Sequence, residues 1–588
     1  MKPPLDVRLV PAAVAGWLAA VVLVDAAPHA AWVASGAALA AALVVVLRAT
    51  RAAAGGGSSG AAGAPPGGSL AGVQGARGAR GAAGARAGRR SAGWLVVVSL
   101  VVVAAAGASC ALTSVRTSSA LMQGASGTGA TVWVTGVVTS DPRPLRTRSS
   151  DPQEEAATSF RVSLDVRTVV VASPGRARES QGVAVPVSLV GAAAWEQARV
   201  GATVTAWGRL RPADGSRRER FELAGPSPPM LVDTEPAPLV VAGVVRRAFA
   251  SVAEHRAPGV AGLVRGMTVG DRAGVPERVD AAMRATGLTH LTAVSGAHVA
   301  IVVGAALGVL AAARVPRLWR AGAAGVVLVG FVVLVRPDPS VLRAALMGAV
   351  ALLGTALGRP SRSLSALAAV VVGLVLADPW IARSFGFVLS VVATAALVLG
   401  AAPLAAALER RRVPSWAALL VAVPVVAQLA CGPVVVLLSA SVPTYAVLAN
   451  VLVAPVVGVA TITGVVAAVL APWWPAAAGV VVVPSCWAAA WVQGVAATLA
   501  SAPGATVPWV GGALGAVLLA AATAGACVLV WSWPSVRWWW QDVRVARRHA
   551  ATVRRVRRER AVVSEIRGIL GPWPRRARPH APPPRLRG

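Results

Sequence analysis

The stretch from Gly287 to Val302, GLTHLTAVSGAHVAIV, combines polar and apolar residues. It lies where a long polar region gives way to a nearly unbroken series of apolar segments. Its polar and small residues are Gly287, Thr289, His290, Thr292, Ser295, Gly296 and His298. A polar group at bilayer depth must find a partner or line a wet cavity, so this cluster indicates a pathway or a binding site.

Helical geometry would bring several of these side chains together. At about 100° per residue, His290 and His298 lie roughly 80° apart on a helix, and Ser295 and His298 are neighbours on one face. Gly296 offers a break in such a helix. A structural interpretation stays open, in which Thr and Ser bond back to helix carbonyls, the histidines pack neutrally, and Gly296 allows close helix contact.

Composition independently indicates a polytopic membrane protein. The 588 residues are 56% hydrophobic and only 14% charged, which is too apolar for a soluble globular protein. The net charge of +32 is carried mostly by arginine, but cytoplasmic loops of any membrane protein are enriched in basic residues, so the charge alone is weak evidence for DNA. The cysteines show no CxxC pairing, which indicates small buried side chains: Cys110, Cys431, Cys486 and Cys527.

The N-terminal part divides into three segments. Residues 1–47 hold two apolar stretches joined by a short bend, which we interpret as a retained transmembrane hairpin. Residues 48–92 are rich in Gly, Ala and Arg and contain no acid, so a disordered cytoplasmic linker is expected. A third transmembrane helix is expected over residues 93–112.

Residues 113–238 change to alternating β-branched patterns separated by turn residues. Five short strands, near 130–140, 159–171, 183–190, 202–210 and 220–225, suit a small barrel of the OB type. With 14 basic and 12 acidic residues the segment is nearly neutral, which argues against a strong electrostatic grip on DNA. Four aromatic residues are expected in the barrel core, with base stacking as the alternative: Trp133, Phe160, Trp207 and Phe221.

Residues 239–287 are expected to form amphipathic helices that lead into a bundle of membrane spans over 288–533. Nine spans are expected in that region, near residues 288–313, 320–336, 339–357, 363–377, 384–407, 415–440, 444–470, 477–500 and 510–533. If the first starts outside, the Arg-rich loops and the basic tail 534–588, with 15 basic and 3 acidic residues, all fall inside. About twelve spans with both termini cytoplasmic result, unless the segment 477–500 is re-entrant.

Few large polar side chains occur within these spans. Arg343 lies in the first turns of a span, where it either snorkels to the outer surface or faces a wet pore and holds phosphate. Asp378 and Arg383 flank the start of another span and could pair with each other. Asn450, followed by Pro455, indicates a broken helix lining a cavity or an interhelical hydrogen bond.

The run Leu263–Val302 resembles the competence domain of the ComEC family, inner-membrane channels for single-stranded DNA in natural transformation. The motifs that carry the resemblance are the turn Gly270-Asp271-Arg272, the helix end Thr286-Gly287-Leu288, His290, and the triplet around Ser295, Gly296 and His298. Similar stretches follow at 339–348, at 377–400 and around Asn450. The resemblance implies an extracytoplasmic OB-like domain and a DNA pathway through His290, Thr292, Ser295, Gly296, His298, Arg343 and Asn450. Asp271, Arg272, Asp378 and Arg383 are then structural turn residues.

Many ComEC proteins end in a metallo-β-lactamase-like domain with an HxHxDH motif. This sequence has no such motif and no GxxxxGK[ST], so we expect no metal, no cofactor and no enzymatic activity, with energy supplied by partners. The expected partners are single-stranded DNA, membrane lipid, an extracytoplasmic DNA receptor and a cytoplasmic helicase-type or single-strand-binding protein. A homo-oligomer is compatible with the sequence.

Two other functional classes remain open. A secondary transporter for a small solute would also explain polar residues at midplane, but not an inserted β domain. An intramembrane serine protease is indicated by Ala293-Val294-Ser295-Gly296, which resembles the GxSG of rhomboids without its first Gly. His298 could hydrogen-bond Ser295, yet a nucleophile also needs an oxyanion site.

Overall fold

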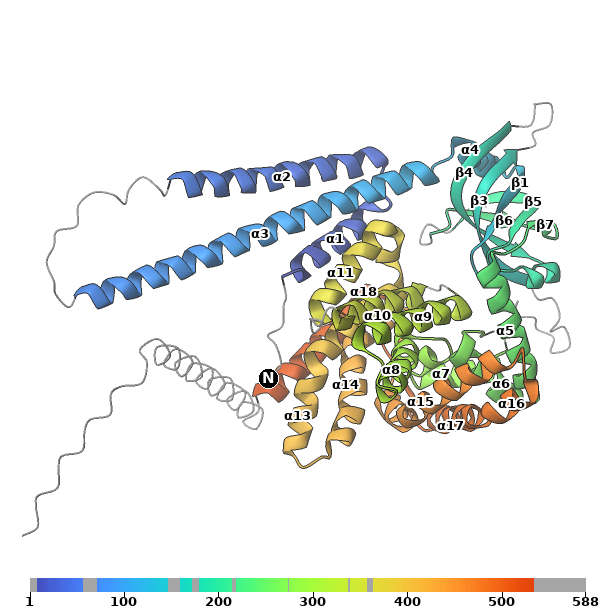
Figure 1. Ribbon diagram of the computed structural model, residues 1–588. Coiled ribbons are helices and arrows are strands. Elements are labelled where there is room, and N and C mark those ends of the chain that lie inside the picture. The colour runs from blue at the N-terminus through green and yellow to red at the C-terminus, as the bar shows by residue number, and fades with distance from the viewer. Residues whose placement is uncertain are drawn as a thin grey trace, which may run out of the picture.

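The structure is a computed structural model, and it describes residues 8–55, 71–145, 159–171, 179–213, 218–272, 274–336, 339–356 and 363–532. The basic tail expected over 534–588 lies outside these residues. Figure 1 shows two long helices, a small barrel at one end of them, and a bundle of shorter helices below. The bundle carries the stretch from Gly287 to Val302.

Three helices form the N-terminal layer: α1 (Val10–Leu23), α2 (Pro28–Gly55) and α3 (Ala71–Thr117). α2 and α3 run side by side along most of their length (Figure 1). α1 also packs against α3, and this close approach depends on Gly16 of α1. A Cβ at Gly16 would lie 2.5 Å from the Val102 side chain of α3. Both long helices extend into the segment expected to be disordered: residues 48–55 and 71–92 are helical, and 56–70 lie outside the described residues. Alanine and arginine have high helix propensities, which compensate for the low helix propensity of the glycines in these residues.

The β segment folds as a closed ring of five strands. Its strands are β1 (Thr131–Val138), β2 (Arg143–Leu145), β3 (Ser159–Val171), β4 (Glu179–Gly191), β5 (Thr203–Pro212), β6 (Phe221–Ala224) and β7 (Met230–Asp233). The ring runs β1-β3-β4-β6-β5 and closes by pairing of β5 with β1; only β4 and β6 are parallel. β2 and β7 extend it as short edge strands that the sequence did not predict.

Alternating apolar residues fill the barrel. Trp195 on the short helix η1 (Ala193–Gln197) is fully buried, and its indole nitrogen donates to the Ser227 carbonyl at 2.9 Å. α4 (Ala120–Thr128) contributes Met122 to the same core. Phe160 and Phe221 belong to this core as expected, whereas Trp133 and Trp207 are exposed, so the expectation of a core position is wrong for both tryptophans.

The remaining helices form the bundle. They are α5 (Ala237–Glu254), α6 (Pro258–Val269), α7 (Glu277–Ala285), α8 (Gly296–Ala312), α9 (Arg317–Val335), α10 (Pro339–Ala356), α11 (Ser363–Ala377), α12 (Phe385–Ala396), α13 (Ala402–Arg410), α14 (Ser415–Val435), α15 (Ala446–Leu470), α16 (Pro475–Val481), α17 (Val483–Ala500) and α18 (Gly512–Ser532). A five-residue π turn, η4 (Leu397–Ala401), joins α12 to α13. Two 3-10 turns, η2 (Thr289–Leu291) and η3 (Pro379–Arg383), precede α8 and α12.

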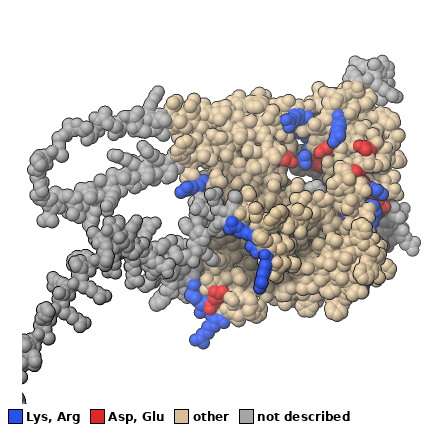
Figure 2. All heavy atoms as spheres, in the orientation of Figure 1, with Lys and Arg blue, Asp and Glu red and all other residues tan. Residues whose placement is uncertain are grey.

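Many of these helices have the length and composition of membrane spans. Within the described residues, six are long and apolar enough to cross a membrane, or seven if the bent pair α16 and α17 is one span. Five further apolar helices are shorter: Val10–Leu23, Gly296–Ala312, Val341–Gly354, Leu364–Ala377 and Gly512–Val528. These helices are compatible with a polytopic membrane protein. Figure 2 agrees, since most of the visible face is uncharged.

Two loops at the ends of helices pair with each other. β8 (Ser441–Pro443), before α15, pairs antiparallel with β9 (Thr506–Pro508), which follows α17. α16 and α17 are bent by 43° at the break between them. The pairing brings the end of α17 back to the level at which α15 begins.

Candidate functional site

The stretch from Gly287 to Val302 is a folded loop followed by a helix, and not the single helix expected from residue 288. α7 ends before Gly287, whose φ of +68° lies in the left-handed region. A Cβ at this position would lie 2.9 Å from the Ala446 side chain, so only glycine fits both the turn and the contact with α15. Leu288 and Leu291 are buried in the core that includes Ala449, which anchors the loop against α15.

A helix cap accounts for the contact between Ser295 and His298. Ser295 is the N-cap residue of α8 and His298 occupies the third helical position. The Nδ1 atom of His298 accepts the Ser295 backbone N–H at 3.1 Å and lies 2.9 Å from the Ser295 hydroxyl oxygen. This contact resembles a capping box in which the third side chain reaches back to the N-cap backbone. Because Nδ1 accepts, the proton of the neutral ring resides on Nε2.

The polar residues of the loop differ in exposure. His298 is fully buried, and its Nε2 atom has no hydrogen-bond partner among the described residues. Thr292 is buried as well, and its hydroxyl donates to the Thr289 carbonyl at 2.8 Å. His290 is exposed. The loop therefore leaves His290 at a surface and His298 in the core, and the angle expected for a continuous helix does not apply.

Gly296 links this cap to Arg343. A Cβ on Gly296 would lie 3.5 Å from the Ala344 side chain of α10, an ordinary contact distance. The neighbouring Arg343 is only 3% exposed, so it does not snorkel to the surface of the chain. Its Nη2 donates to the Gly386 carbonyl at 2.8 Å, and its guanidinium lies 5.6 Å from the ring centroid of Phe387. Arg343 thus joins α10 to the first turn of α12.

Asn450 lies one turn into α15, next to the loop. Its side-chain nitrogen donates to the Ala446 carbonyl of its own helix at 2.8 Å. α15 continues through Pro455 as one helix, so the expected broken helix is wrong, and the hydrogen bond of the Asn450 side chain lies within that helix.

The first turns of four helices therefore form a connected row. α15 contacts the loop at Gly287, the loop leads into α8, α8 meets α10 at Gly296, and α10 meets α12 through Arg343. We name this set, the starts of α15, α8, α10 and α12 with the loop 287–295, the helix-start row. The structure brings Ser295, Gly296, His298, Arg343 and Asn450 into it.

The barrel docks on the same side of the bundle as the helix-start row. Asp141, in the loop after β1, forms ion pairs with Arg246 of α5, at 3.5 Å, and with Arg336 at the end of α9. α10 begins three residues after Arg336. Burial lowers the pKa of Arg246 from its usual value, while the nearby Asp271 carboxylate raises it and Arg265 lowers it further. The Asp141 carboxylate therefore supplies a negative charge to two guanidinium groups at the contact between barrel and bundle.

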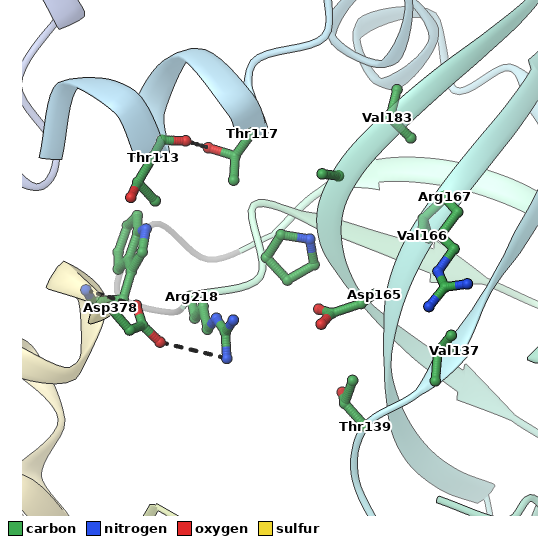
Figure 3. Close-up of a pocket in the computed structure, with 13 residues that line it drawn as sticks. Thr113, Thr117, Val137, Thr139, Asp165, Val166, Arg167, Val183, Arg218 and Asp378 are labelled. Carbon is green, nitrogen blue, oxygen red and sulfur yellow. Dashed lines mark hydrogen bonds and ion pairs between the residues drawn. The ribbon is translucent and has the colours of Figure 1, made fainter. Parts of the chain in front are cut away.

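A second docking contact encloses a cavity. Arg218 of the barrel pairs with Asp378 at 3.6 Å, and the Arg220 guanidinium lies 5.6 Å from the Trp380 ring centroid. A cavity of about 340 Å³ lies here between the barrel, the end of α3 and η3. In Figure 3, Thr113 and Thr117 of α3 border one side of this cavity and Asp165 of β3 borders another.

The four turn residues have separate partners. Asp271 follows the left-handed Gly270 at the end of α6 and accepts from Arg265, whereas Arg272 is exposed. Asp378 caps η3 by accepting the Trp380 N–H at 3.1 Å. Arg383 pairs with Asp25 and donates to the Val21 carbonyl at 2.9 Å. The expected pairing of Asp378 with Arg383 is therefore wrong, because each finds a partner from a different part of the chain.

Sequence reasoning missed the docking residues Asp141, Arg218, Arg246 and Arg336. Asp141 lies in a turn with Ser and Pro, and Arg246 reads as the polar face of an amphipathic helix. Nothing in the sequence distinguishes these charges from solvated ones. Among the residues that the structure describes, no group of three or more His, Cys, Asp or Glu side chains could hold a metal ion.

Comparison with known proteins identifies the helical region. Residues 267–534, which include the helix-start row, match the family described as Competence protein. A curated relative, ComE operon protein 3 of Bacillus subtilis (strain 168), is 34% identical over 142 residues, covering 24% of this chain and 18% of the relative. No solved structure matches the chain. Over residues 267–534, the chain is similar to the competence proteins of the ComEC family.

Proposed function

We propose that this protein is a channel in the cytoplasmic membrane that carries single-stranded DNA inward during DNA uptake. The observation that carries the proposal is the match of residues 267–534 to the competence family, because that region contains Arg343 and the helix-start row. The match to the relative covers only 18% of its length, so the substrate and the direction of transport are part of the proposal.

The helix-start row has the chemistry to receive phosphate. Helix N-termini carry unsatisfied N–H groups and a partial positive charge, which favour anions. The guanidinium of Arg343 adds a full charge and a planar fork that fits phosphate oxygens. Arg343 is buried between the starts of α10 and α12, which places its positive charge within the helix-start row.

The proposed topology has about twelve spans, both termini in the cytoplasm and the barrel outside. Two groups of basic residues lie at the helix ends away from the docked barrel: Arg314, Arg317 and Arg320, and Arg410 to Arg412. Figure 2 shows one such group of basic residues at the lower edge of the molecule, far from the barrel. The β8 and β9 pairing supports a full crossing by residues 475–500, because α17 ends beside the start of α15.

The barrel is assigned to the OB type. A closed five-stranded barrel built from consecutive antiparallel strands, with one parallel contact, supports this assignment. The cavity beside Arg218, Asp378 and Trp380 offers an entrance next to the barrel. An extracytoplasmic receptor would supply the strand, and a helicase-type or single-strand-binding protein would draw it into the cytoplasm. A homo-oligomer fits the same scheme.

The capping geometry gives no support to a protease. Nδ1 of His298 is already the acceptor for the Ser295 backbone N–H, and no third described side chain orients the ring. A general base needs an orienting partner on its second nitrogen. The same hydrogen bonds are fully explained as the start of α8.

Uptake measurements in a deletion strain test the proposal. The strain is complemented with the wild-type chain or with Arg343→Gln, and uptake of labelled DNA is compared with uptake of labelled small solutes. We expect DNA uptake to require the wild-type chain while solute uptake stays unchanged. If the deletion strain loses solute uptake but takes up DNA normally, the channel proposal is rejected in favour of a solute transporter.

A further inference from the structure

A pair of exposed tryptophans lies on the outer face of the barrel. Trp133 of β1 and Trp207 of β5 face each other in register across the seam that closes the ring. They are 37% and 44% exposed, and their ring centroids are 6.2 Å apart at an interplanar angle of 42°. Burial of a large aromatic side chain is energetically favourable. Two adjacent exposed rings on a well-packed barrel therefore indicate a surface that binds another molecule.

Cations follow the tryptophans along the same strand. β5 alternates between core and surface, so Trp207, Arg209 and Arg211 all point outward. On the outward face of β1 and β5 the other residues are threonines and Val137, with no acidic side chain. Glu222 of β6 is the nearest acid in register, opposite Arg211, whereas Arg209 has Ala224 and Thr131 as its neighbours.

We propose that Trp133, Trp207, Arg209 and Arg211 form a base-stacking surface for single-stranded nucleic acid on the outside of the barrel. Exposed aromatic faces beside cations are the combination that binds single strands without sequence preference, since every base has a face that stacks and every phosphate carries charge. This site is separate from the helix-start row. The inference rests on the proposed function only for the choice of DNA as the probe.

Position along β1 argues for an aqueous partner and against lipid. The barrel docks on the bundle at the far end of β1, where Val138 leads to Asp141. Trp133 lies five residues before Val138, about 16 Å along the strand. A membrane-interface tryptophan would lie at the level of the helix ends, where Arg246 and Arg336 are.

The pair also has a structural effect that must be separated from binding. Cross-strand aromatic pairs stabilise antiparallel sheets, and this pair lies on the seam of the ring. Valine keeps the strand preference and removes the stacking face, whereas phenylalanine keeps both. The informative variants are therefore the double changes Trp133→Val with Trp207→Val, and Trp133→Phe with Trp207→Phe.

Fluorescence anisotropy with labelled 20-nucleotide oligothymidine tests the inference, using the full chain in lipid nanodiscs. We expect the valine pair to weaken binding about tenfold or more and the phenylalanine pair to bind nearly as the wild type does. Trp319→Val, which removes a 74% exposed tryptophan on α9, is the matched control and should bind normally. Unchanged affinity in the valine pair would overturn the proposal.

Two further measurements keep the outcomes distinct. If the valine pair does not fold, Arg209→Gln with Arg211→Gln takes its place and should both weaken binding and flatten its salt dependence; affinity and salt slope equal to the wild type would overturn the proposal. Arg317→Gln, which removes an exposed cation at the start of α9, should retain full oligothymidine binding. If the wild-type chain does not bind oligothymidine but DNA uptake is intact, the proposed base-stacking surface is rejected and the proposed channel function is retained.

Discussion

Nδ1 of His298 accepts the backbone N–H of Ser295 at 3.1 Å, and the Ser295 hydroxyl oxygen lies 2.9 Å from the same nitrogen. The imidazole therefore holds the Ser295 backbone at the first turn of α8 through a hydrogen bond that does not need the hydroxyl. The sharpest prediction about the stretch from Gly287 to Val302 follows from this hydrogen bond.

We expect Ser295→Ala to be mild and His298→Leu to be severe for DNA uptake. Alanine leaves the backbone N–H and its acceptor intact, whereas leucine leaves that N–H without its partner, at a cost of about 1–3 kcal/mol. Uptake of labelled DNA, normalised to protein level in the membrane, measures both. An inactive Ser295→Ala beside an active His298→Leu would mean that the hydroxyl performs chemistry.

The space at Gly296 gives a graded prediction. A Cβ there would make an ordinary 3.5 Å contact with Ala344, so Gly296→Ala should retain most uptake. Gly296→Leu should abolish uptake, because its further carbons would push α8 away from α10. Gly304 on the same helix, where a Cβ meets nothing within 4 Å, supplies the control Gly304→Leu, which should be tolerated. Equal activity of both leucine variants would show that this contact is unimportant.

Arg343 should be essential for transfer and not for the presence of the protein. Arg343→Gln keeps a hydrogen-bond donor for the Gly386 carbonyl but removes the charge, so DNA uptake should fall at least tenfold with normal protein level. Arg343→Lys should retain part of the activity. Arg320→Gln, in the first turn of α9 at the end away from the barrel, is the control. If Arg343→Gln takes up DNA at the wild-type rate, Arg343 is not part of the DNA pathway.

Asp141 should hold the barrel on the bundle. Asp141→Asn leaves Arg246 and Arg336 without their shared anion, and we expect a loss of about 1–3 kcal/mol in the stability of the docked state. Thermal unfolding in detergent should show the barrel melting earlier than the helices. Asp233→Asn, at an exposed position in β7, should leave the melting profile unchanged. Identical profiles for the two variants would indicate that the ion pairs contribute little.

Cysteine labelling checks the topology. In a background without the native cysteines, Thr234→Cys and Val507→Cys should react with a membrane-impermeant thiol reagent in intact cells, whereas Ser58→Cys should be shielded. The Val507 position tests the crossing by residues 475–500, since its strand pairs with the loop before α15. Labelling at Ser58 with protection at Thr234 would invert the whole arrangement, and protection at Val507 alone would make α16 and α17 a re-entrant pair.

The sequence predicted the features that depend on local pattern. All five strands of the ring lie where alternating β-branched residues indicated them, and Asp271 lies in the expected turn after Gly270. The helical start at Gly296 was not recognised, because the run from Gly287 to Val302 is apolar enough to read as one helix. Ser295 at an N-cap with a polar residue three positions later was the available signal.

Contacts between distant segments could not be predicted. Arg383 pairs with Asp25 and not with Asp378, and Arg246 is buried against Asp141 although it occupies the polar face of its helix. Whether a charge on an amphipathic helix is solvated depends on which element packs over it. The exposure of Trp133 and Trp207 could not be predicted for a similar reason. An alternating pattern predicts that a strand has two faces, but not which of them is buried inside the barrel.

The π turn from Leu397 to Ala401 divides the span from Phe385 to Arg410 into two parts that need not move together. One extra residue in a turn advances the helix by about 100°, so α12 and α13 present different faces to their neighbours. A π turn can shift along a helix by exchanging hydrogen bonds one at a time. In this span such a shift would rotate only the residues that the turn passes, so the middle of the span could present a different face to α14 while the Gly386 carbonyl keeps its contact with Arg343 and α13 stays packed on α14.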